Sequence, residues 1–186
     1  MKKLFIALLL AVLVCPILPA QSLSADDLKK ALQYLDKSRA GVLAATKGLS
    51  AAQWNFKPAT NKWSVAEVAE HIAAAEDFLR DMVADKVMKS PARTEAVDVK
   101  AIDEFVMQAV PDRSHKVQAP EPLQPSNRFG SPKESLKHFK TSRAETVKFL
   151  KTTADLRGHA MDAPLGKKLD AYEWQREKSS SIRVVR

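Results

Sequence analysis

The sequence predicts an all-α protein, a four-helix bundle with a long crossover between helices 2 and 3 and an incomplete fourth helix. Three observations favour this fold class. Only 5 of the 186 residues are glycine, and the strong helix formers Ala, Leu, Lys and Glu are abundant. Apolar residues recur at three- and four-residue steps along the long segments, which is the period of a helix buried on one side. The sequence lacks the β-branched runs and frequent turns of a sandwich or barrel.

The first helix is expected over residues 25–47. Ser24 precedes it as an N-cap, because a serine hydroxyl can accept a hydrogen bond from a free backbone N–H of the first turn, and Gly48 can end it. Ser50 and Gln53 form an S-x-x-Q capping pattern, so we expect one short helical turn there. The apolar stripe of the first helix consists of Leu28, Leu32, Leu35, Val42 and Leu43.

The second helix is expected to run from a capping box of Ser64 and Glu67 to about Met88. His71 lies one residue round from the apolar face of this helix, where its ring can still point inward. Trp63 directly precedes the N-cap, and we expect it to pack across the start of the helix in preference to lining a pocket. The predicted buried face consists of Val65, Val68, Ile72, Ala75, Leu79 and Met82.

Residues 92–130 are interpreted as a long crossover with one short helix, because an amphipathic stretch is followed by four prolines. The third long helix opens at Ser131, with Pro132 at its first position and Glu134 at its third, and it is expected to end near Thr153. The amphipathic stretch of the crossover contains Ile102, Phe105, Val106 and Val110.

A fourth helix is expected to begin at Leu169, after a connection over residues 158–168. Its pattern fades after Trp174, because residues 175–186 show no helical apolar repeat and include three consecutive serines, which weaken a helix. We therefore expect residues 175–186 to be an irregular tail, produced by a frameshift or truncation or present as a natural variant. A bundle with this end leaves an apolar groove uncovered.

The N-terminal residues 1–22 have the pattern of a bacterial signal peptide. Lys2 and Lys3 precede an apolar run over residues 4–14, and small residues follow at Ala20 and Ser22. The run is too short for a membrane span, which needs about 20 apolar residues. We therefore expect export to the periplasm or medium, no stable membrane anchor after cleavage, and a single domain over residues 23–186.

Cysteine and charge exclude further classes. The one cysteine, Cys15, lies inside the predicted signal peptide, and Val14 before it disfavours a lipoprotein signal. The mature chain then has no thiol for a nucleophile, a disulfide or a metal site. The formal charge is +8, but the cations alternate with acids along the helices and are not interleaved with aromatics. We expect no nucleic-acid partner.

Two stretches of this sequence together resemble the DinB-like superfamily. Residues 49–58 read Leu-Ser-Ala-Ala-Gln-Trp-Asn-Phe-Lys-Pro, and residues 61–76 contain Lys-Trp-Ser, a capping acid and a His followed by an aliphatic residue and a Glu. The resemblance implies a four-helix bundle with a long crossover, often dimeric. It also implies a divalent metal such as zinc, nickel or manganese, held by one histidine on the second helix and two histidines four residues apart on the fourth. Such sites serve thiol-linked transferases and isomerases similar to this family.

Only His71 transfers from this pattern. His115, His138 and His159 do not stand at the family's positions, and no His-x-x-x-His pair follows Trp174. One imidazole is too few for a stable metal site. We therefore predict an exported DinB-like protein, descended from a metal-dependent thiol-linked enzyme, with an incomplete metal site and no bound metal of its own.

An alternative function and two interpretations of the residues around His71 stay open. A non-catalytic module could use the bundle groove to bind an unidentified small molecule or to form a homodimer. His71 itself is interpreted as a packed, hydrogen-bonded residue in preference to a metal ligand. Glu70 and Glu76 are interpreted as solvated helix-face acids in preference to groups that reach a metal or orient the ring. No other catalytic motif, such as G-x-S-x-G or H-E-x-x-H, occurs in the sequence.

Overall fold

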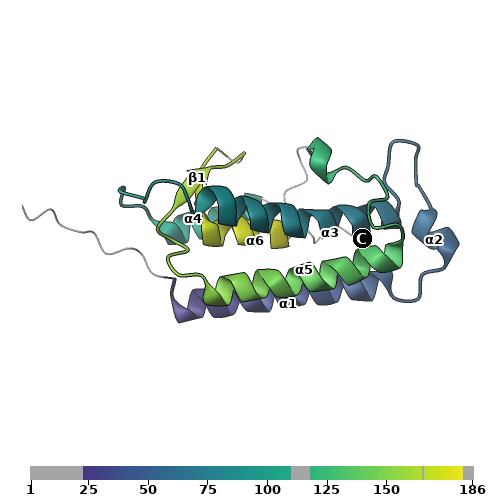
Figure 1. The fold of residues 1–186 in the computed structure, drawn as a ribbon, viewed down its shortest axis with the longest axis horizontal. Coiled ribbons are helices and arrows are strands. Elements are labelled where there is room, and N and C mark those ends of the chain that lie inside the picture. The colour runs from purple at the N-terminus through teal and green to yellow at the C-terminus, as the bar shows by residue number, and fades with distance from the viewer. Residues whose placement is uncertain (1–22, 110–117, 165, 182–186) are drawn as a thin grey trace, which may run out of the picture.

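The computed structural model describes residues 23–109, 118–164 and 166–181 and is mostly helical (Figure 1), as predicted. The expected signal peptide at residues 1–22, His115 and the last five residues of the expected tail lie outside these ranges. Within the described ranges, no helix combines the length and apolar character that a membrane crossing requires.

Three long helices form the body of the structure. They are α1 (Ala25–Thr46), α3 (Val65–Met82), which continues as the π-helical turn η1 (Val83–Val87), and α5 (Pro132–Thr152). The short helix α2 (Ala51–Asn55) links the first two. α5 packs against both α1 and α3, and α1 and α5 lie side by side along their length (Figure 1). The two helices therefore share a long interface.

The predicted helix starts are confirmed by their capping contacts. The hydroxyl of Ser24 accepts a hydrogen bond from the backbone N–H of Asp27, and Ser131 does the same for Glu134. Ser50 and Ser64 each take part in a complete capping box. Gly48 follows α1 with a φ of +74°, a left-handed conformation that glycine adopts without strain.

The crossover carries the predicted helix α4 (Val99–Ala109) and a short 3-10 turn, η2 (Glu121–Leu123). α4 packs against α6 (Ala171–Ser181), which in turn contacts α1 and α3. Before α6, the expected plain connection contains a small hairpin of β1 (Ala160–Asp162) and β2 (Lys168–Asp170), paired antiparallel with Met161 opposite Leu169. Leu169 therefore ends up in a strand, and the helix begins two residues later than expected.

The last helix is longer than the sequence indicated. α6 continues past Trp174 to Ser181, although no helical repeat was found there. The physical reason lies in its first turn, where Asp170 and Glu173 form reciprocal cap contacts, and both are fully buried. Gln175 is also buried, at 1 % exposure. Tertiary packing of the first turns outweighs the weak helix propensity of the serines.

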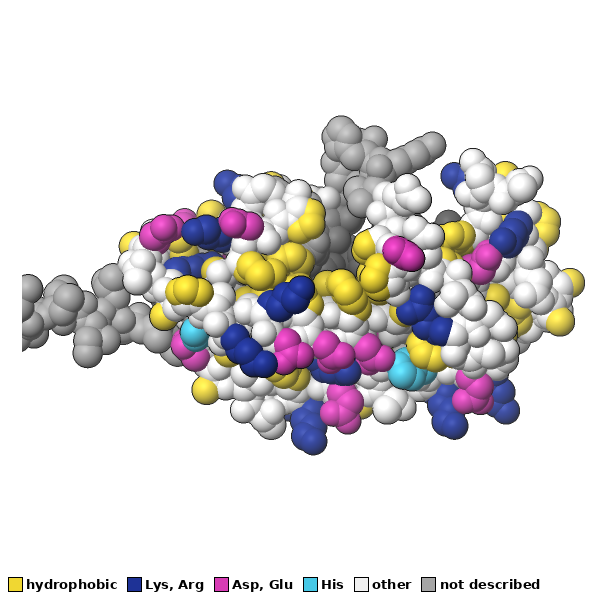
Figure 2. Space-filling model, turned by 45° about the horizontal axis from the view of Figure 1, so that its top comes forward, with side chains coloured by type: hydrophobic (Ala, Val, Ile, Leu, Met, Phe, Trp, Pro, Cys, Tyr) yellow, Lys and Arg dark blue, Asp and Glu magenta, His cyan; other side chains and the backbone are white. Residues whose placement is uncertain are grey.

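Charged side chains of both signs are mixed on the face formed by α3 and the crossover (Figure 2). On α3, Arg80 pairs with Asp77 at 3.1 Å and with Asp81 at 3.2 Å. Just beyond the helix, Lys89 pairs with Asp85 at 2.8 Å. These local pairs agree with the alternation of cations and acids in the sequence.

Candidate functional site

His71 of α3 is half-buried, and one of its two ring nitrogens is hydrogen-bonded to the backbone. Its Nδ1 lies 2.9 Å from the carbonyl oxygen of Leu123 in η2. A carbonyl oxygen only accepts, so Nδ1 is the donor in this contact. The Trp63 ring packs beside it, with a centroid separation of 5.0 Å. His71 is therefore packed and hydrogen-bonded, as one of its two interpretations held, and Trp63 contacts it across the start of α3.

Glu70 is not a solvated acid, and that interpretation was wrong. Only 5 % of its surface is exposed, and it accepts hydrogen bonds from the backbone N–H groups of Ser126 (2.7 Å), Asn127 (2.9 Å) and Arg128 (3.2 Å). Burial opposes ionisation, but the N–H donors of Ser126 and Arg128 outweigh it and hold the pKa of the Glu70 carboxyl below its ordinary value. Glu70 therefore anchors the end of the crossover beside His71.

Glu76 is also buried, so the same correction applies to it. It is fully inaccessible and accepts hydrogen bonds from Nε (3.1 Å) and Nη2 (2.6 Å) of Arg143 and from the Thr146 hydroxyl (3.2 Å). Arg143 uses its remaining donor nitrogen, Nη1, on the Leu35 carbonyl and the Ser38 hydroxyl of α1, each at 2.7 Å. This buried network joins α1, α3 and α5.

The other described histidines have local partners of their own. Nε2 of His138 contacts the Asp77 carboxylate, and the imidazole stacks on Phe129 at 4.4 Å. Nδ1 of His159 contacts the Ser90 carbonyl oxygen. These contacts do not bring either imidazole to a common site with His71.

The described residues do not fit the three-histidine centre that the DinB resemblance implies. No group of three or more His, Cys, Asp or Glu side chains in the described ranges could hold a metal ion. The carboxylate of Glu70, the neighbour of His71 in the sequence, accepts hydrogen bonds from the backbone of the crossover. His71 has one ring nitrogen oriented by a backbone carbonyl, as ligand histidines often do, but it shares this feature with His159.

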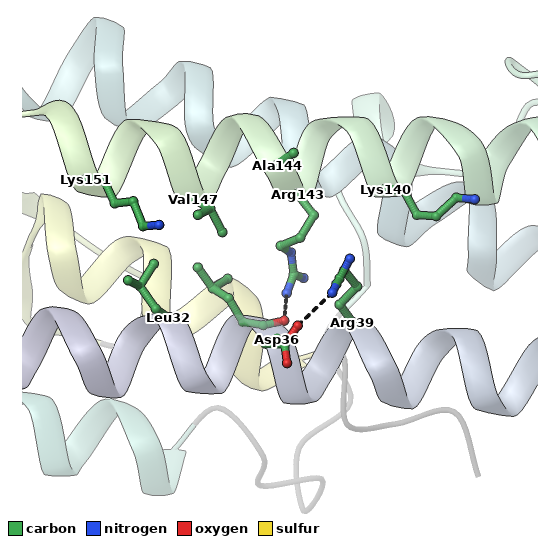
Figure 3. A pocket seen from close by; sticks show the side chains of 9 residues that line it. Leu32, Asp36, Arg39, Lys140, Arg143, Ala144, Val147 and Lys151 are labelled. Atoms are coloured by element: carbon green, nitrogen blue, oxygen red, sulfur yellow. Dashed lines mark hydrogen bonds and ion pairs between the residues drawn. The ribbon is translucent and has the colours of Figure 1, made fainter.

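A groove with a volume of about 330 Å³ lies between α1 and α5 (Figure 3). One half is apolar, because Leu32 of α1 and Val147 of α5 point toward one another there. The other half is polar, where Arg143 reaches from α5 toward α1 and Arg39 pairs with Asp36 at 2.8 Å. The remaining lining residues are Leu35, Lys140, Ala144 and Lys151.

The groove is lined by more positive than negative side chains. The Arg143 cation is matched by buried Glu76, and the Arg39 cation by Asp36. Lys140 and Lys151 also line the groove, and neither makes an ion pair with another described residue. The groove therefore combines an apolar floor with an excess of positive charge. The sequence showed each side chain, but it gave no signal that residues about a hundred positions apart would face one another.

A second buried cluster surrounds Arg157, in the turn before β1. Its guanidinium donates to both carboxylate oxygens of Asp103 (3.0 and 2.7 Å), to Asp170 (3.0 Å) and to Glu173 (3.3 Å). It also lies over the Tyr172 ring, 4.2 Å from the centroid. Arg157 is 2 % exposed and thus links α4, β2 and α6 inside the protein.

The excess of carboxylates around Arg157 perturbs their protonation. Burial, together with the neighbouring Asp170 charge, raises the pKa of Glu173 to about 8. Burial also raises the pKa of Asp170, against the attraction of Arg157. Desolvation raises the pKa of Tyr172 to about 12. The cluster therefore favours a proton on Glu173 near neutral pH, and it serves as a structural hub in the fold.

Comparison with known proteins is informative for the family. A model of the DinB superfamily matches residues 34–176, which is well over half of the chain. The uncharacterized protein YuaE of Bacillus subtilis (strain 168) is 35 % identical over 83 residues, which are 45 % of this chain and 47 % of that protein. The match thus spans about half the length of that relative, and no solved structure matches. The chain belongs to the DinB superfamily.

Proposed function

We propose that this chain is a binding module on the DinB scaffold, in which α1, α3, α5 and α6 form a four-helix bundle. Its binding site is the groove between α1 and α5, which takes up a small, partly apolar molecule. The observation that carries the proposal is the groove itself, with its apolar half at Leu32 and Val147 and its polar half at Arg39 and Arg143. Small-molecule sites are typically concave and mostly apolar, with a few fixed polar groups, and begin at about 300 Å³.

The polar wall of the groove is held in place before any ligand arrives. Arg143 is 2 % exposed, and hydrogen bonds to Glu76, Leu35 and Ser38 fix its guanidinium. A side chain that is already ordered loses little conformational entropy on binding. This preorganisation supports a role in binding, and it accounts for a buried ion pair where an apolar core would be expected.

We also propose that the protein works outside the cytoplasm once residues 1–22 are removed. The support for this is the positive start and apolar run of those residues, together with the location of the one cysteine among them. A thiol-free mature chain suits an oxidising compartment.

The test uses an eight-carbon chain with and without charge, octanoate and 1-octanol, titrated calorimetrically into the full chain. Ala144 is an exposed groove residue, so Ala144→Phe fills the groove without removing any buried contact. Ala101 is exposed on α4 outside the groove, and Ala101→Phe is the matched control. We expect saturable binding of at least one compound to wild type and Ala101→Phe, and none to Ala144→Phe. Binding by neither compound, or equal binding to Ala144→Phe, would sink the proposal.

A metal centre at His71 is the second candidate. It is favoured by one observation, the contact of Nδ1 with the Leu123 carbonyl, which leaves Nε2 ready to ligate. The metal centre predicts that the purified protein holds metal through His71, whereas the binding module predicts that it does not.

A further inference from the structure

We infer that the ligand of the α1–α5 groove is a single-chain amphipathic anion, with its head between Arg39 and Lys140 and its tail along Leu32 and Val147. This inference rests on the proposed function and adds the chemical class of the ligand. It follows from the order of side chains along the groove and from their charges.

The polar end of the groove offers a place for an anionic head. Arg39 and Lys140 come from facing helices and are both exposed, so their charged groups are accessible to a ligand. Arg39 shares its charge with Asp36, whereas Lys140 has no ion-pair partner among the described residues. An incoming carboxylate therefore meets one partly compensated guanidinium and one uncompensated ammonium group. A cationic head would be repelled at the same place.

Arg143 lies deeper and does not receive the head. Its Nε and Nη2 donate to Glu76, and its Nη1 donates to Leu35 and Ser38. Its charge is likewise cancelled by Glu76, at 2.6 Å. Arg143 is neutralised by Glu76, so specificity for an anion depends on the exposed groups of Arg39 and Lys140.

The apolar end of the groove suits a hydrocarbon tail. Leu32 and Val147 are half-buried and face one another, so a chain between them removes further apolar surface from water. Lys151 stands at this end, and its alkyl stem can cover the tail while its ammonium group stays in water. Lys151 thus adds positive potential without contacting the head, which distinguishes it from Lys140.

The test compares the dissociation constants of octanoate and 1-octanol, which share a chain and differ in charge. We expect wild type to bind octanoate roughly fivefold more tightly, because an exposed ion pair contributes modestly. Lys140→Gln should abolish most of this preference, and Lys151→Gln, the matched loss of one charge, should reduce it much less. The preference should also shrink as sodium chloride is raised.

The outcomes separate the inference from the function beneath it. If both compounds bind equally in the groove, the binding module stands and the anionic ligand is refuted. If Lys140→Gln and Lys151→Gln have equal effects, the assigned position of the head is refuted. Should neither compound bind, both proposals fall. Sedimentation of wild type as a dimer that Ala144→Phe dissociates would instead give the groove to a second copy of the chain and overturn the inference.

Discussion

Replacement of Arg157 by Met is expected to lower the free energy of unfolding by about 3–5 kcal/mol, the range typical of a buried ion pair that loses one partner. Arg157 is the central cation among the buried carboxylates of Asp103, Asp170 and Glu173. Without it, these acids lose hydrogen-bond donors that water cannot replace. The protein must then protonate them or separate α4 from α6.

Urea denaturation at neutral pH, followed by circular dichroism, measures this loss. Arg39→Met is the matched control, since Arg39 makes an exposed pair with Asp36 and should cost no more than about 1 kcal/mol. Equal effects of the two substitutions would contradict the role of Arg157 as a hub. A melt in which α4 alone separates would instead show that the hub fixes the crossover.

Replacement of Glu173 by Gln is expected to remove a large pH dependence of stability. The pKa of Glu173 is about 8 in the folded protein, above its ordinary value of 4.5. The folded state therefore binds this proton more tightly than the unfolded state does. The resulting stabilisation is fully present below about pH 4.5 and is lost as the pH rises to about 8. The loss is on the order of a few kcal/mol, because each unit of difference contributes about 1.4 kcal/mol.

The measurement is the free energy of unfolding from pH 5 to pH 9 for wild type and Glu173→Gln. Gln carries no proton to lose. It keeps one oxygen, so it can accept either from Arg157 or from the Asp170 backbone N–H, whereas the two oxygens of Glu173 accept from one donor each. We expect the free energy of unfolding of wild type to fall with pH relative to that of the variant. Glu145→Gln, an exposed change on α5, should run parallel to wild type. Parallel curves for Glu173→Gln would show that the acid is already ionised at low pH.

The features that the sequence predicted best are local ones. The starts of α1, α3 and α5 were predicted because their caps involve residues three apart, such as Ser64 and Glu67. α4 was predicted from its amphipathic period. The hairpin of β1 and β2 was missed because strands of three residues are too short to show an alternating pattern.

The burial of the acids on α3 could not be predicted, because their partners are distant in the chain. Glu70 meets the backbone of residues 126–128, and Glu76 meets Arg143. Charged residues usually face solvent, so a local interpretation gives the wrong environment for both. The start of α6 was predicted at Leu169, two residues early; the reciprocal cap contacts of Asp170 and Glu173 explain why the helix begins at Ala171.

The resemblance of residues 49–76 to the DinB-like family was confirmed by the family match over residues 34–176. It points to His71 as a ligand position, which stays a prediction; the structure shows only that the ring contacts the Leu123 carbonyl. It could not identify the groove, which depends on the packing of α1 against α5 and on the network behind Arg143.

The central claim is that this DinB-superfamily chain is a binding module and does not hold a metal through His71. The most direct test equilibrates full-length wild type and His71→Ala with zinc, nickel and manganese, removes the excess, and measures metal by mass spectrometry. We expect both proteins to hold the same amount, well below one equivalent. One equivalent in wild type that is lost in His71→Ala would contradict the claim and make His71 part of a metal centre.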